Sequence, residues 1–213
     1  MSLPRERAPL PTPVEGTALL ERAVGYTRTS LQLVAGSDLT ARTPCTHWDL
    51  LTLLHHMDDS LAAFTDAAEI GYVDLAPEQP GEQPGEQLVG RLKGRACALL
   101  AAWAASPTPG AVTVADRAMP SELLAAAGSL EIAVHGWDVA RACGVDRPLP
   151  AALASELLDV VPLLVGDADR PRRFAEPVVV PPDAAAGSRL LAALGRPGPA
   201  DYQVMQGFQR SSW

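Results

Sequence analysis

Residues 121–143, SELLAAAGSLEIAVHGWDVARAC, decide the fold, because their apolar side chains recur at the spacing of a helix. Leu130 and Val134 fall on one side of a helical wheel, and Ile132 and Val139 fall on the opposite side. A helix that is apolar on two sides is largely buried. We therefore expect this segment to be a buried helix in a mainly α protein.

Three more segments repeat the helical spacing of apolar residues, and they lie within 20–34, 50–64 and 88–103. A fifth helix is expected near 151–164, after the turn GVDRPLP. The second of the three segments is predicted to begin with Thr46 capping the backbone N–H of Asp49 and to end at Gly71. A short strand or extended link is expected at 111–115, and a small helix at 188–194. Four long helices, with a long connection between the second and third, predict a four-helix bundle with short C-terminal extras.

The composition along the chain predicts one folded unit over residues 14–199. Residues 1–13 are rich in proline and charge and are expected to be a flexible arm, and residues 200–213 a polar C-terminal tail. The repeat APEQPGEQPGEQ at 75–86 is expected to be a loop, because proline lacks the N–H that a helix needs and glycine is costly there.

The overall composition excludes several classes of partner. The net charge of −8 repels phosphate backbones and anionic lipid, so neither nucleic acid nor a membrane surface is expected as a partner. Cys45, Cys97 and Cys143 are far apart and form no CxxC pair, so each is expected to be a small buried hydrophobe. No apolar run approaches the roughly 20 residues that span a bilayer. The N-terminus has no signal peptide pattern, and we expect a cytoplasmic protein.

Glu131, His135 and Asp138 share one strip of the buried helix, between its two apolar sides. Glu131 and His135 are four residues apart and therefore stack one turn over the other. A buried carboxylate is costly unless it is paired or bound to a metal, so the two residues are a candidate ligand pair. Spacing alone also allows, and by itself favours, a Glu–His hydrogen bond in the core.

The second helix offers three histidines as further ligands. His47 lies at the predicted helix start, His55 points away from the apolar stripe, and His56 flanks that stripe, which is where a side chain reaches the space between helices. His56, Glu131 and His135 would form a set with open coordination positions that suits zinc best, and also nickel, iron or manganese.

Three more residues are candidates to support those ligands. Asp59 and Asp138 each follow a proposed histidine ligand by one turn and could orient its ring N–H, although surface charge explains them equally well. His55 would support the site from outside the ligand set or face solvent.

Two of these segments resemble a known family. TPCTHWDLLTLLHHM (43–57) resembles the second-helix signature of the DinB superfamily, in its mycothiol-dependent maleylpyruvate isomerase branch, and EIAVHGWDVARACG (131–144) resembles the fourth-helix motif. SRLLAALGRPGP (188–199) is similar to the closing segment of its single-domain members. The resemblance implies a metal-dependent four-helix fold with zinc or a similar ion on His56, Glu131 and His135.

The resemblance also implies thiol chemistry, in which a low-molecular-weight thiol such as mycothiol binds the metal, ionises and attacks an electrophile. The full isomerase has a C-terminal sterol-carrier-like lobe, which we do not expect within this sequence, and Thr52 stands where the signature often has an acidic residue. These departures favour a thiol S-transferase over the isomerase reaction itself. The alternative is a non-catalytic metal-binding protein, and a plain bundle whose histidines fill the core is disfavoured by the resemblance.

Two explanations are open for the arginines near the predicted site. Arg91, Arg95 and Arg141 could recognise an anionic part of the thiol or of its acceptor, but surface salt bridges explain them as well, and we favour that explanation. A homodimer through the flank of the bundle is the remaining expectation about partners.

Overall fold

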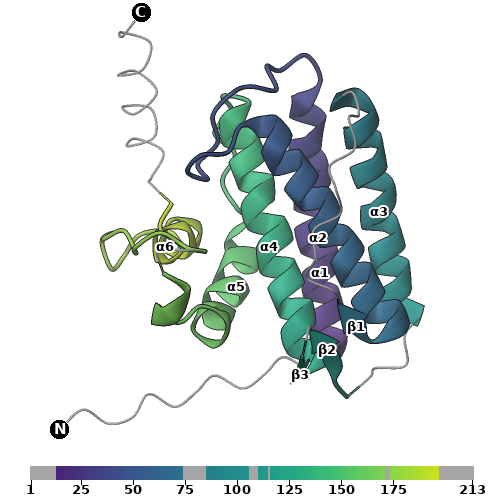
Figure 1. Cartoon of the computed structure of the whole chain (residues 1–213). Coiled ribbons are helices and arrows are strands. Elements are labelled where there is room, and N and C mark those ends of the chain that lie inside the picture. Colours follow the sequence, from purple (N-terminus) through teal and green to yellow (C-terminus); the bar gives the residue numbers. More distant parts are fainter. Residues whose placement is uncertain (1–12, 74–84, 106–109, 115, 171–172, 197–213) are drawn as a thin grey trace, which may run out of the picture.

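The computed structural model describes residues 13–73, 85–105, 110–114, 116–170 and 173–196. Its main body is a bundle of four helices, α1 (Pro13–Ser30), α2 (Leu50–Ile70), α3 (Gly85–Ala105) and α4 (Ser121–Ala142) (Figure 1). The predicted mainly α fold is confirmed. The predicted arm and polar tail lie outside the described residues, apart from Pro13, which begins α1, and so does the EQPG loop up to residue 84.

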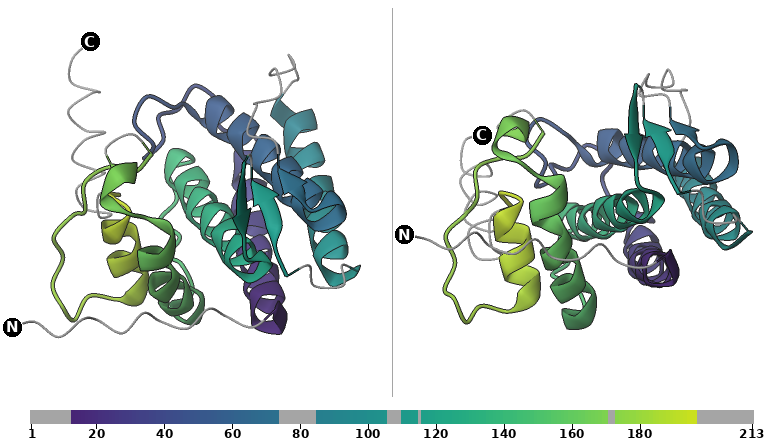
Figure 2. Two further views of the ribbon diagram at one scale, coloured as in Figure 1. Left: turned by 60° about the horizontal axis from the view of Figure 1, so that its bottom comes forward. Right: turned by 90° about the horizontal axis from the view of Figure 1, so that it is seen from below.

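The helices pack in a defined order around α4. Helix α1 packs against α4, α2 packs against both α3 and α4, and α5 (Ala151–Leu164) lies on α4 with α6 (Ala186–Ala193) beside it (Figure 2). Two short 3-10 helices, Leu31–Val34 and Asp167–Asp169, complete the helical elements of the described chain. The helix predicted near 151–164 is confirmed at Ala151–Leu164.

A small sheet closes one end of the bundle (Figure 1). Strands β1 (Tyr72–Val73) and β2 (Val112–Val114) pair in parallel, and β2 pairs with β3 (Arg117–Met119) in antiparallel fashion. The short strand expected at 111–115 is therefore confirmed at Val112–Val114.

Helix α4 is buried over almost its whole length, as its two apolar sides predict. Its contact with α1 is very close at Gly136, where a Cβ atom would lie 2.3 Å from Thr27 Oγ1. The same hydroxyl donates a hydrogen bond of 2.7 Å to the carbonyl of Ile132. Glycine at this position lets the two helix backbones approach.

The start of α2 differs from the predicted cap at Thr46. Asp49 is the capping residue, and its side chain accepts a hydrogen bond of 2.8 Å from the backbone N–H of Thr52. The chain turns just before it: the Trp48 N–H donates to the Cys45 carbonyl, and His47 has a left-handed φ of 73°. This turn moves the helix start to Leu50, too far along the chain for Thr46 to cap it. Gly71 ends α2 in the left-handed conformation, as predicted.

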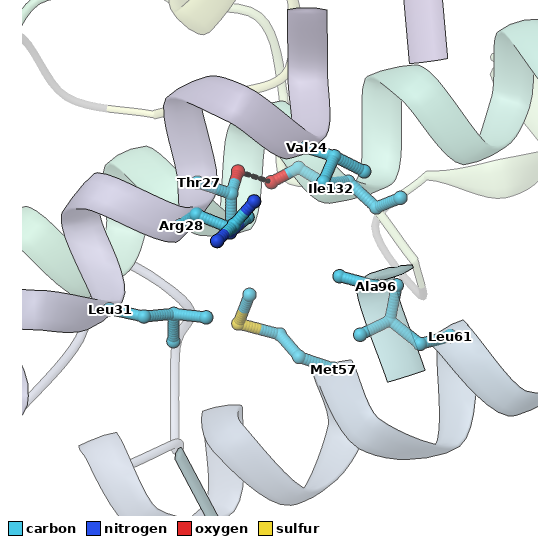
Figure 3. Close-up of a pocket in the computed structure, with 8 residues that line it drawn as sticks. All are labelled: Val24, Thr27, Arg28, Leu31, Met57, Leu61, Ala96 and Ile132. Carbon is cyan, nitrogen blue, oxygen red and sulfur yellow. Dashed lines mark hydrogen bonds between the residues drawn. The ribbon is translucent and has the colours of Figure 1, made fainter. Parts of the chain in front are cut away.

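A small cavity of about 20 Å³ lies inside the bundle between α1, α2, α3 and α4. Its lining is apolar apart from Thr27 and the exposed Arg28, and Met57 reaches into it from α2 (Figure 3). This volume holds a water-sized group and no larger ligand. Separately, none of the described helices has the length and apolar character needed to cross a bilayer.

Candidate metal centre

Helices α2 and α4 bring His56, Glu131 and His135 together. The Glu131 Oε1 atom lies 2.6 Å from His56 Nε2 and 3.1 Å from His135 Nε2. One nitrogen or oxygen atom from each of the three side chains lies within 4.8 Å of the others. Two imidazoles and a carboxylate at this separation form a donor set that fits a divalent metal ion such as zinc.

The three donors are not equally covered. The side chains of His56 and Glu131 keep 35% and 29% of their exposure, whereas His135 keeps 8%. The site is therefore open to solvent at His56 and Glu131 and closed at His135. A centre with three protein donors and an open side leaves room for another ligand, which is the arrangement of catalytic rather than structural zinc sites.

The electrostatics of the metal-free cluster favour opposite charges on Glu131 and His135. Burial raises the pKa of Glu131, but the charge of His135 and the hydrogen bonds from both histidines hold that pKa well below its ordinary value. Burial lowers the pKa of His135, but the charge of Glu131 and the bond to Asp138 raise it well above its ordinary value. The cluster thus stabilises positive charge between these side chains, whether on an imidazole or on a cation.

Asp138 holds the far nitrogen of His135. Its Oδ2 atom lies 2.9 Å from His135 Nδ1, so the Nε2 atom of the ring is left to face Glu131. Burial raises the pKa of Asp138, but the charge of Arg196 and the bond to His135 lower it to about 2. A carboxylate behind a histidine in this way fixes the orientation of the ring.

Trp48 and Ser60 form the surroundings of the donors. The Trp48 ring centroid lies 4.7 Å from that of His56 and 6.1 Å from that of His135, so the indole covers both imidazoles from the turn before α2. The Ser60 hydroxyl donates a hydrogen bond of 3.3 Å to Glu131 Oε1. Both contacts restrict the movement of the donor side chains.

His55 and Asp59 lie at half-buried positions on α2. Within the described ranges, neither residue belongs to a group of donor atoms close enough to share a metal ion. The supporting roles expected for them from the sequence stay predictions, whereas the geometry expected for Asp138 is present.

Two residues beside the site were not identified as part of it from the sequence, Cys45 and Arg196. Cys45 Sγ lies 3.3 Å from Asp138 Oδ2, and Arg196 Nη2 lies 2.8 Å from the same oxygen. Burial, together with the charge of Asp138, raises the pKa of the Cys45 thiol. Cys45 stands in the TPC motif, which could have signalled its place. For Arg196 the signal was indirect, since a buried Asp138 needs a positive partner.

The arginines considered from the sequence do not form surface salt bridges of the expected kind. Arg91 and Arg95 of α3 both pair with Asp58, a fully buried carboxylate on α2, with Arg95 Nε 3.0 Å from Asp58 Oδ1. Arg141 is itself buried, lies 3.1 Å from Asp146 and stands over the Trp137 ring. The expectation was wrong for Arg91 and Arg95 because the sequence did not reveal their buried partner on α2, and for Arg141 because its own side chain is buried.

Four helices with these donors on α2 and α4 define the class of the protein, a DinB-like helical bundle. The family described as mycothiol maleylpyruvate isomerase N-terminal domain matches residues 20–140, which is more than half of the chain, and the chain belongs to this family. The match includes all three candidate ligands and Asp138 but ends before α5, α6 and Arg196. Neither the curated proteins nor the solved structures contain a match to the chain.

Proposed function

We propose that this protein is a metal-dependent thiol S-transferase, with zinc as the first candidate metal. In this proposal His56, Glu131 and His135 hold the ion, and a low-molecular-weight thiol such as mycothiol is the cosubstrate. The observation that carries the proposal is the open side of the three-donor set, where His56 and Glu131 remain about one-third exposed. The family of the chain is associated with mycothiol, which supports the choice of thiol.

The metal would supply a Lewis acid that lowers the pKa of a bound thiol, so that a thiolate is available at neutral pH. The chain's own residues set up that chemistry. Asp138 holds His135 by its Nδ1 atom, and Glu131 supplies the negative charge that attracts a divalent cation. The indole of Trp48 shields the imidazoles on one side, which strengthens electrostatic interactions there.

The proposed reaction is either a displacement or an addition at an electrophilic carbon. The thiol loses its proton to solvent, its sulfur forms a bond to an electrophilic carbon, and either a leaving group departs or the carbon skeleton takes up a proton. Such a reaction needs reduced thiol, which is consistent with a protein of the cytoplasm.

The alternative function is metal binding without catalysis. It keeps the same three residues as ligands and differs in having no affinity for a thiol. The open side of the site favours the enzyme, because structural zinc sites are closed by four protein ligands.

The test is the metal content of the purified protein, measured beside a thiol titration by calorimetry. His56→Ala and His135→Ala are expected to lose the metal, and His55→Ala, which removes a neighbouring histidine outside the donor set, is the matched control. The metal-loaded wild type is expected to bind mycothiol and to couple it to a chlorinated nitroaromatic probe with release of chloride. Metal without thiol binding would favour the alternative. A wild type that takes up no divalent metal would contradict both functions.

A further inference from the structure

A second group of donor atoms overlaps the candidate metal centre. Cys45, His135 and Asp138 each place one donor atom within 4.8 Å of the others, and His135 belongs to both groups. The two groups use opposite nitrogens of its ring: Nε2 faces Glu131, whereas Nδ1 lies 2.9 Å from Asp138 Oδ2 and 3.9 Å from Cys45 Sγ. A thiol, an imidazole and a carboxylate are also a zinc-type donor set. The fold therefore contains two adjacent places where a divalent ion could compete for one histidine.

The guanidinium of Arg196 already supplies the positive charge at the second group. Its Nη2 atom lies 2.8 Å from Asp138 Oδ2 and 3.4 Å from Cys45 Sγ, and its Nε atom lies 3.4 Å from Asp138 Oδ1. The arginine side chain is 10% exposed and Asp138 is fully buried, so this ion pair is shielded from solvent. A metal ion bound there would face a fixed positive charge at short range, which is strongly unfavourable away from water.

The chain places Arg196 by a helix-ending turn. Gly195 has a left-handed φ of 73°, its N–H donates to the Ala192 carbonyl, and the Arg196 N–H donates to the Leu191 carbonyl. These two bonds are the Schellman arrangement that follows a helix, and it ends α6 with the arginine turned back toward α4. A side chain on Gly195 has no room, since its Cβ would lie 2.7 Å from backbone atoms of Ala175.

We propose that Arg196 is a positioning residue that keeps the second donor group closed to metal and reserves His135 for the first. It acts through Asp138, which it holds against Nδ1, so that His135 offers only Nε2 as a ligand. This inference rests on the proposed metal centre. It concerns a residue outside the part of the chain that matches the family, because the match ends at residue 140. Arg196 instead belongs to the C-terminal segment that follows α6.

Cobalt(II) titration tests the inference, because cobalt replaces zinc and a cobalt–thiolate bond absorbs strongly in the near ultraviolet. Wild type is expected to bind one cobalt ion per chain without this thiolate band. Arg196→Met keeps much of the side-chain volume and removes the charge, and it is expected to gain the thiolate band, with or without a second ion. Adding Cys45→Ser to Arg196→Met is expected to abolish the band, and Arg196→Lys is expected to restore the wild-type spectrum.

Gly195→Ala gives an independent variant that leaves the chemistry of Arg196 unchanged. It displaces the turn, and it is expected to gain a weaker thiolate band than Arg196→Met. If Arg196→Met fails to fold because Asp138 has lost its arginine partner, Gly195→Ala still tests the inference. The inference is overturned if the folded variants keep the wild-type spectrum and stoichiometry, or if wild type itself has the thiolate band. Wild type without any bound cobalt contradicts the proposed metal centre, while the thiolate band of the variants still decides the role of Arg196.

Discussion

Gly136 gives the sharpest test of how α4 is packed, because the residue beside it is the candidate ligand His135. In Gly136→Ala the new Cβ would lie 2.3 Å from Thr27 Oγ1 and 3.1 Å from the Thr27 Cα atom, which belongs to the backbone of α1. Overpacking of this kind costs about 1–3 kcal/mol. Rotation of the Thr27 hydroxyl would relieve part of the clash but would break its buried bond to Ile132, at about 1 kcal/mol. Alanine returns about 1 kcal/mol of helix propensity, so we expect a net loss of about 2 kcal/mol.

Urea unfolding of the metal-free protein measures this loss, with Gly94→Ala as the matched control. Gly94 is exposed within α3, and a Cβ there would meet nothing within 4 Å. The control substitution is therefore expected to raise the free energy of unfolding by about 0.5–1 kcal/mol. The two identical substitutions should shift the midpoint in opposite directions. A Gly136→Ala protein as stable as wild type would refute the close approach of α1 and α4.

Three further predictions follow from individual residues. Asp49→Ala should lower the free energy of unfolding, measured in urea, by about 1 kcal/mol, because it removes the cap of α2. Thr46→Ala is the control and should change that free energy by less than half as much. Equal effects of the two substitutions would contradict the observed cap. Asp58→Asn should cost about 2 kcal/mol by the same assay, because two arginines of α3 lose their buried partner; an unchanged midpoint would show that this ion pair contributes nothing. The folded pKa of Asp138 is depressed from 3.8 to about 2, which at about 1.4 kcal/mol per tenfold change corresponds to roughly 2.5 kcal/mol of stability. That stability is present above pH 3.8 and is lost as the pH falls through about 2. The free energies of unfolding of wild type and Asp138→Asn, measured in urea with a chelator, should therefore differ most near neutral pH and converge in acid.

The sequence predicted the elements whose apolar period is long and unbroken. Helix α4 lies where its apolar period places it, and α2 and α4 bring the side chains of His56, Glu131 and His135 together. That these residues bind a metal stays a prediction. The wheel sufficed here because each residue lies on a regular helix whose buried side is set by its neighbours.

The features that the sequence did not predict depend on contacts between distant segments or on irregular backbone. The cap of α2 depends on the left-handed turn at His47, and no local pattern announces that conformation in a residue other than glycine. The partners of Asp58 lie on α3, and Arg196 reaches Asp138 from 58 residues further along the chain. Side-chain pairs of this kind are fixed by tertiary packing, which a helical wheel does not describe.

The near-complete burial of α4 has a consequence for how the site would exchange its ion. Amide hydrogens in such a helix are expected to exchange with solvent mainly through global opening, whereas helices with an exposed side open locally more often. Glu131 and His135 are carried by the slowly exchanging element, and His56 by α2, whose open side faces water. In the proposed metal centre, an ion would then enter and leave through local opening of α2 while α4 stays folded, and its release would not require global unfolding.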